Sequence, residues 1–127
     1  MPHIIVEYSA NLDHRIDAGK LVADLHQAVI DSGIAEVAAI RTRAERRDAF
    51  KVADGAPDNA FVHVVMRLRT GRTKEVLQRM ADTLLAATDR NLQAAYAIHP
   101  VAITVEMEEI SNLTVRKNTI REKERTA

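Results

Sequence analysis

The chemically most suggestive feature of this sequence is a proline that directly follows the initiator methionine and opens a strand-like run. Residues 1–7 read Met-Pro-His-Ile-Ile-Val-Glu. Methionine aminopeptidase normally removes the initiator before a residue as small as proline, which leaves Pro2 with a free secondary amine. An unperturbed α-amino group has a pKa of ~7.7–8.0, and burial or nearby arginines lower it, which suits a general base at neutral pH. The alternative is that proline simply suits a frayed chain end, but the ordered strand expected at residues 3–8 favours catalysis.

A group of arginines supplies the positive charge that an anionic substrate needs. Four fall within seven residues, and the fifth precedes an expected helix; they are Arg41, Arg43, Arg46, Arg47 and Arg72. A guanidinium group binds a carboxylate through two parallel hydrogen bonds. Arg72 is the most suggestive, because a helix N-terminus already favours anions. The alternative for the cluster is a solvated strand end and loop paired with Glu45 and Asp48, and we interpret Arg46 and Arg47 in this way.

Composition excludes several classes of function. The chain has 127 residues, no cysteine, and equal numbers of basic and acidic residues. The length predicts a single domain over residues 1–127, and the absence of net charge argues against a nucleic-acid partner. The five histidines show no metal-ligand spacing, so we expect no metal. Apolar runs are too short for a membrane span, and we expect a cytoplasmic protein without membrane contact.

Hydrophobic periodicity predicts six main elements in the order strand, helix, strand, strand, helix, strand. We expect strands at residues 3–8, 34–42, 60–68 and 101–108, and helices at residues 13–31 and 74–91. Gly33 should end the first helix in the left-handed conformation, and Thr73 should cap the second. These elements form an α/β (α+β) fold, in which two β-α-β units build a four-stranded sheet with two helices on one face.

Two helices can cover only one face of such a sheet. The strands at residues 3–8 and 60–68 nevertheless carry apolar side chains at successive positions, which predicts apolar residues on both faces. An uncovered apolar face is typically a partner surface. We therefore expect a homo-oligomer that buries this face, because the tail after Ser111 is too polar to cover it.

With Pro2, Arg41 and Arg72 identified, the sequence resembles the 5-carboxymethyl-2-hydroxymuconate isomerases of the tautomerase superfamily over nearly its whole length. The motifs that carry the resemblance are residues 1–7, Gly33-Ile34, 40–43 (Ile-Arg-Thr-Arg), 53–55 (Ala-Asp-Gly), 60–63 (Ala-Phe-Val-His), Gly71-Arg72 and 105–109 (Val-Glu-Met-Glu-Glu). Each motif is short, but their order and spacing together are specific.

The resemblance implies a tautomerase-type fold that assembles as a homotrimer and works without cofactor or metal. It implies that Pro2 is the general base, which moves a proton from the 2-hydroxyl of a dienol to a carbon further along the conjugated system. It also implies that Arg41 and Arg72 bind substrate carboxylates or the developing oxyanion, with Phe50 in the pocket. We expect Arg43 to bind the substrate as well. The expected function is an isomerase of aromatic catabolism that ketonises 5-carboxymethyl-2-hydroxymuconate, a small carboxylate-rich substrate.

Three alternatives stay open on the sequence. One is a sibling tautomerase with another enol-acid substrate, and the second is a proline-dependent decarboxylase or hydratase. The third is a non-catalytic ligand-binding module with the ferredoxin-like β-α-β-β-α-β fold, which also places two helices on one sheet face. Loss of Met1 separates these classes, because only the enzymes need a free amine on Pro2.

Overall fold

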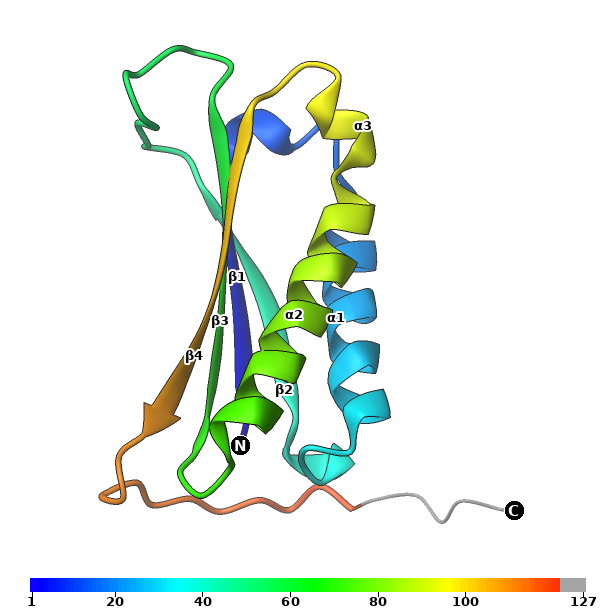
Figure 1. Cartoon of the computed structure of the whole chain (residues 1–127), viewed down its shortest axis with the longest axis vertical. Coiled ribbons are helices and arrows are strands. Elements are labelled where there is room, and N and C mark those ends of the chain that lie inside the picture. The colour runs from blue at the N-terminus through cyan, green and yellow to red at the C-terminus, as the bar shows by residue number, and fades with distance from the viewer. Residues whose placement is uncertain (122–127) are drawn as a thin grey trace.

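A computed structural model describes residues 1–121 as a four-stranded sheet with helices packed on one of its faces (Figure 1). The strands are β1 (His3–Ser9), β2 (Arg41–Arg47), β3 (Ala60–Arg69) and β4 (Val101–Ile110). The helices are α1 (Ala18–Ser32), α2 (Lys74–Asn91) and the short α3 (Gln93–Tyr96), with single 3-10 turns η1 (Ala10–Leu12) and η2 (Val37–Ala39). None of the helices within residues 1–121 is both long enough and apolar enough to cross a membrane.

The strand order is β2-β1-β3-β4. Strands β1 and β2 pair in parallel, as do β3 and β4, and the two pairs meet where β1 and β3 run antiparallel. One crossover helix, α1 or α2, joins the strands of each parallel pair. The predicted fold of two β-α-β units is therefore confirmed. In a ferredoxin-like split βαβ arrangement the two strands of one unit are not neighbours, so this topology excludes that alternative.

The hydrophobic core lies between the sheet and the helices. Alternate residues of the two central strands are buried on this side; they are Ile4, Val6, Val62, Val64 and Met66. The helices contribute Leu21, Leu25 and Val29 from α1, and Met80 and Leu84 from α2. Burial of one such side chain stabilises the fold by about 1.5–3 kcal/mol. A slip of one residue in strand pairing would expose these side chains, so the core fixes the register.

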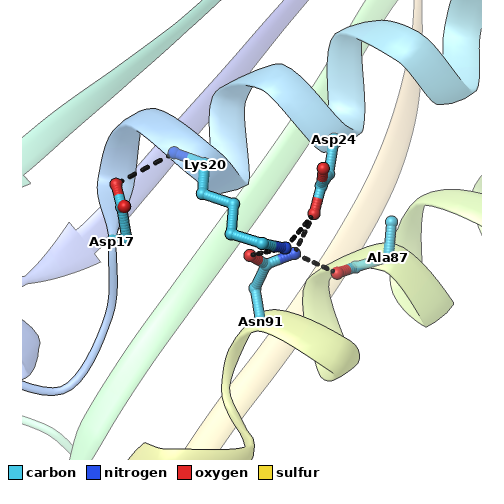
Figure 2. Close-up of polar contacts among 5 residues, drawn as sticks. All are labelled: Asp17, Lys20, Asp24, Ala87 and Asn91. Atoms are coloured by element: carbon cyan, nitrogen blue, oxygen red, sulfur yellow. Dashed lines mark hydrogen bonds and ion pairs between the residues drawn. The ribbon is translucent and has the colours of Figure 1, made fainter.

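Polar contacts fix where α1 begins and how it lies against α2 (Figure 2). Asp17 caps α1, because its carboxylate accepts a hydrogen bond from the Lys20 backbone N–H at 3.0 Å. The Lys20 ammonium group pairs with the Asp24 carboxylate at 2.7 Å. Asn91 donates hydrogen bonds to the Asp24 carboxylate at 3.0 Å and to the Ala87 carbonyl at 2.8 Å. The last turn of α2 is therefore tied to the first turns of α1.

Two predicted helix ends are confirmed, and one predicted helix start is wrong. Gly33 follows α1 with a φ of 67°, a left-handed conformation that glycine adopts at little cost. Thr73 caps α2, because its side chain accepts a hydrogen bond from the Val76 N–H at 3.2 Å. Helix α1 begins at Ala18 rather than at residue 13, since Asp17 supplies the cap.

The prediction that the second strand covers residues 34–42 is wrong. Strand β2 begins at Arg41, and residues 37–39 form η2 instead. The register explains the shift, because Arg41 pairs with His3, the first residue of β1. A strand residue before Arg41 would face Pro2, which lacks the backbone N–H that extends a ladder. The strand continues to residue 47 because β1 remains beside it as a partner.

The uncovered face of the sheet is mostly charged, which corrects the prediction of an apolar patch. Its larger apolar side chains on the central strands are Ile5, Phe61 and Val65, all of them half-buried. Polar contacts surround them: ion pairs of Arg47 with Glu7 at 3.1 Å and of Arg67 with Glu108 at 3.5 Å, and a hydrogen bond between His63 and Glu106 at 2.6 Å. The apolar runs of β1 and β3 predict part of this face, but its charged edges come from β2 and β4.

Candidate active site

The amino terminus lies at the end of the sheet where β1 and β2 begin. Pro2 is buried, and its carbonyl accepts a hydrogen bond from the Arg41 backbone N–H at 3.1 Å. The parallel pairing of His3 with Arg41 continues this contact into the sheet. The Arg41 guanidinium donates a hydrogen bond to the Ala39 carbonyl at 3.0 Å, which anchors it at this end of the sheet. Strand register thus brings together two predicted site residues, Pro2 and Arg41.

A cavity of about 310 Å³ opens beside the amino terminus. The residues that line it are Met1, Arg69, Thr70, Ile110, Ser111, Asn112 and Thr114. Figure 1 shows the tail beyond β4 running along the end of the sheet where the N-terminus lies. Asn118 in this tail donates a hydrogen bond to the Ala38 carbonyl at 2.9 Å. The cavity is therefore enclosed by the chain start, the end of β3 and the C-terminal tail.

Burial and three arginines hold the pKa of the terminal amino group below its ordinary value of 8.0. Burial is the largest cause, because it disfavours the charged form; the positive charges of Arg41, Arg116 and Arg69 follow, and Glu36 opposes them. In the chain with Met1 this amine belongs to Met1, and the Pro2 nitrogen is an amide. Removal of Met1 transfers the amine to Pro2, at most about 3.8 Å further along the chain.

The arginines around the amine have no carboxylate partner among residues 1–121. This holds for Arg41, Arg69 and Arg116, whereas Arg47 and Arg67 elsewhere on the sheet form the ion pairs described above. Like charges that lie close together repel one another, and an anion between them relieves the repulsion. Unpaired cations beside an amine of lowered pKa therefore suit an anionic substrate from which a proton is to be removed.

Arg46 and Arg47 are not the solvated loop charges that the sequence predicts. Both lie within β2, because β1 pairs with that segment along its whole length. Their ion-pair partners are Asp13 and Asp48 for Arg46, and Glu7 and Glu45 for Arg47. The expected pairing with Glu45 and Asp48 is confirmed, but these arginines lie at the far end of β2 from Pro2.

Arg72 lies between β3 and α2, and its guanidinium is bound by backbone carbonyls. It donates hydrogen bonds to the Ile34 carbonyl at 2.7 Å and to the Arg69 carbonyl at 3.1 Å. Gly71, with a φ of 115°, turns the chain just before it. Arg72 is not among the residues that line the cavity. It joins the loop after α1 to the end of β3, and it holds the backbone of Arg69, which does line the cavity.

Arg43 lies two residues beyond Arg41 along β2, on the uncovered face of the sheet, where it contacts a histidine. Its guanidinium nitrogen lies 3.1 Å from Nδ1 of His3. Burial, followed by the charges of Arg43 and Arg41, lowers the pKa of His3. A neutral His3 accepts the hydrogen bond from Arg43 and adds no charge to the strip of positive charge that Arg41 and Arg43 form on β2. Arg43 thus borders the amino-terminal region without lining the cavity.

Phe50 lies at the opposite end of the sheet from Pro2. It follows the end of β2 and packs edge-on against Phe61, with ring centroids 6.4 Å apart. It lines a separate cavity of about 190 Å³ in the loop after β2. Strands of seven residues separate the two ends, which is roughly 20 Å at about 3.3 Å per residue. One protomer therefore does not bring Phe50 to Pro2.

Sequence reasoning missed two cations, Arg69 and Arg116. A signal for Arg69 existed in the antiparallel register, because Arg67 pairs with His3 and the next in-phase position places Arg69 opposite Met1. That register was not derivable from the hydrophobic pattern, since periodicity predicts which residues share a face but not their partners. No signal placed Arg116, which lies in a tail without regular structure.

A larger cavity, of about 590 Å³, lies between α1 and α2 and contains none of the predicted site residues. Its lining includes Asp24 and Arg79, both on the helix layer. Within residues 1–121, no three or more histidine, aspartate or glutamate side chains gather in a way that suits a metal ion. The cavity beside the amino terminus is therefore the candidate active site.

Comparison with known proteins agrees with this assignment. The family model of 5-carboxymethyl-2-hydroxymuconate isomerase matches residues 2–124. A relative from Escherichia coli, the 5-carboxymethyl-2-hydroxymuconate Delta-isomerase, is 31% identical over 121 residues, which cover 94% of this chain and 96% of the relative. The crystal structure of a 5-carboxymethyl-2-hydroxymuconate isomerase from Deinococcus radiodurans R1 matches with a TM-score of 0.87 at 30% identity, over 93% of this chain and 90% of that one.

A more distant likeness extends to the wider fold. A fused 4-OT, described as a symmetric trimer, matches with a TM-score of 0.67 at 22% identity, over 85% of each chain. The tautomerase-type fold expected from the sequence is confirmed. The match of the family model over nearly the whole chain, together with the identity to the E. coli relative, shows that this chain belongs to the 5-carboxymethyl-2-hydroxymuconate isomerase family.

Proposed function

We propose that this protein is a cofactor-independent isomerase that ketonises 5-carboxymethyl-2-hydroxymuconate, with Pro2 as the general base. The observation that carries the proposal is an amino group beside a cavity, with its pKa below 8.0 and arginines without carboxylate partners around it. A lowered pKa leaves more of the base in its neutral form at a given pH, and the surplus of positive charge suits a di- or tricarboxylate. The names of the E. coli and Deinococcus relatives agree with this substrate class.

In the proposed reaction, Pro2 takes the proton from the 2-hydroxyl group of the dienol once Met1 has been removed. The C2–O bond becomes a carbonyl, the double bond from C2 to C3 moves to C3 and C4, and the electrons of the C4–C5 double bond take up the proton at C5. One proton leaves oxygen and one arrives at carbon, so atoms and electrons balance without an oxidant. The same nitrogen serves both steps, which is general acid–base catalysis by one group.

We propose that Arg41 and Arg72 stabilise the negative charge of the substrate and of the dienolate. Arg41 lies beside the base, where a guanidinium can hold a carboxylate or the developing oxyanion. Arg72 uses two of the five guanidinium N–H donors on backbone carbonyls and has three left. Arg43, next along the open face, is proposed to extend the same positive strip toward a further carboxylate.

We propose that the protein assembles as a homotrimer, the state given for fused 4-OT proteins of the same fold. Two observations on this chain support an oligomer. Leu113 and Val115 in the tail are 93% and 94% exposed, although they lie next to the amino-terminal cavity. Phe50 lies at the far end of the sheet from Pro2, so a second copy is needed to bring an aromatic ring to the site. A closed ring of three copies would complete three equivalent sites.

Replacing Pro2 tests the base. The Pro2→Ala variant keeps a terminal amine but makes it primary and less constrained, so we expect kcat for ketonisation to fall by roughly 10²-fold or more. The assay follows the dienol by absorbance, and an intact mass measurement should show loss of one methionine residue in the active protein. Unchanged kcat in Pro2→Ala, or full activity in protein that retains Met1, would contradict the proposed base.

Replacing the arginines tests the proposed anion site. In Arg41→Ala and Arg72→Ala the loss of a charge-assisted hydrogen bond, worth about 1.5–3 kcal/mol, should lower kcat/KM by roughly 10- to 150-fold. A change mainly in KM indicates ground-state carboxylate binding, and a change mainly in kcat indicates oxyanion stabilisation. Arg72→Ala should also lower Tm, because its guanidinium binds the Ile34 and Arg69 carbonyls. Arg79→Ala, which removes an exposed charge on α2, is the control, and an equal loss there would refute the assignment.

The assembly is testable by light scattering at micromolar concentration. We expect a mass three times that of one chain, and we expect Val115→Glu to weaken the trimer because it places a charge on a side chain that we infer is covered. Leu85→Glu, a change at an exposed apolar residue of α2, is the matched control and should leave the mass unchanged. A monodisperse monomer of the unaltered protein would be incompatible with this proposal.

A further inference from the structure

We propose that Arg69, at the end of β3, determines specificity by binding the carboxymethyl carboxylate of the substrate. This inference rests on the proposed function and adds to it a residue that neither the sequence motifs nor the arginine pattern indicated. It concerns the recognition of the third carboxylate, the group by which 5-carboxymethyl-2-hydroxymuconate differs from 2-hydroxymuconate.

Arg69 lies beside the amino terminus and has a side chain that can reach a ligand there. Arg69 lines the same cavity as Met1, and it follows Arg67, the residue of β3 that pairs with His3 at the start of β1, by two positions. Its side chain is exposed and forms no ion pair with any carboxylate among residues 1–121. Its backbone carbonyl is held by Arg72, which fixes where the side chain leaves the strand. The Arg69 side chain, which has a fixed backbone and no carboxylate partner among residues 1–121, is therefore available to a ligand in this cavity.

The strand order places the start of β1 between two strands that each carry an arginine. Strand β1 lies between β2 and β3, so the amine at its start has a cation on each side, Arg41 from β2 and Arg69 from β3. Both charges lower the pKa of the terminal amine of Met1. The strands that carry Arg41 and Arg69 therefore lie on opposite sides of the strand that begins beside the base.

The proposed substrate bears two carboxylates next to C5, the carbon that takes up the proton. The base returns its proton to C5, so C5 must lie in contact with the Pro2 nitrogen. In the tricarboxylate, C5 carries two negatively charged groups, the C6 carboxylate and the carboxymethyl group. Two carboxylates that diverge from one carbon next to the base need a cation on each side of it. Arg41 and Arg69 supply that arrangement, and 2-hydroxymuconate, which lacks the extra arm, needs only one of them.

The experiment compares the two dienols as substrates of the full-length enzyme. We expect Arg69→Met to lower kcat/KM for 5-carboxymethyl-2-hydroxymuconate relative to kcat/KM for 2-hydroxymuconate by about 10-fold or more, because one charge-assisted contact is lost. Arg69→Lys, which keeps the charge but not the paired donors, should give an intermediate ratio. The acidic limb of the kcat/KM profile should move to higher pH in Arg69→Met, since removal of a cation raises the pKa of the amine, and it should move less in Arg69→Lys.

Controls separate this inference from a structural effect and from failure of the proposed function. Arg79→Met removes the same charge from α2 and should leave the substrate ratio and the acidic limb unchanged. Thermal unfolding of each variant checks the fold, and Arg69→Lys provides a second variant if Arg69→Met is unstable. If kcat/KM in Arg69→Met is unchanged on both dienols, or falls equally on both, the role of Arg69 is overturned but the proposed function is not. An unaltered enzyme that turns over neither dienol would overturn the proposed function itself.

Discussion

Strand register at the centre of the sheet is the constraint on which both the core and the candidate site depend. Parallel pairing with β2 places Arg41 beside the chain start, and antiparallel pairing with β3 places Arg69 on the other side. The same register turns Ile4 and Val6 toward the helices. A one-residue slip would expose the core and carry the arginines away from the amine at the same time. Burial of apolar side chains therefore holds the charges of the site in position.

The arginines around the amine, unlike Arg47 and Arg67 on the open face, have no carboxylate partner within residues 1–121. On the open face, carboxylates of β1, β2 and β4 pair with Arg47 and Arg67, and the Glu106 carboxylate forms a hydrogen bond with His63. Around the amine, repulsion between Arg41, Arg69 and Arg116 is not relieved by any carboxylate pair within residues 1–121. Surfaces lined by charges of one sign attract ligands of the opposite charge. Here the positive charges lower the pKa of the terminal amine and favour a bound anion.

The sequence predicts the parts of this account that depend on local pattern. Apolar periodicity, Gly33 and Thr73 predict the two β-α-β units and the helix ends, the start of the chain predicts Pro2, and the arginine group predicts Arg41. The parts that depend on pairing between distant strands are not predictable in this way. The start of β2, the charged character of the open face and the approach of Arg69 all follow from register. The distance of Phe50 from Pro2 likewise follows from the direction in which β2 runs.

The most direct test of the account is the titration of the Pro2 nitrogen itself in the intact protein. Nitrogen-15 labelling of proline allows the resonance of this one secondary amine to be followed by NMR as pH is changed. The account predicts a single titration with a pKa below ~7.7–8.0, the range of an unperturbed α-amino group, because burial and the flanking arginines disfavour the charged form. A pKa at or above that range, or an amide resonance that does not titrate because Met1 is retained, would contradict it.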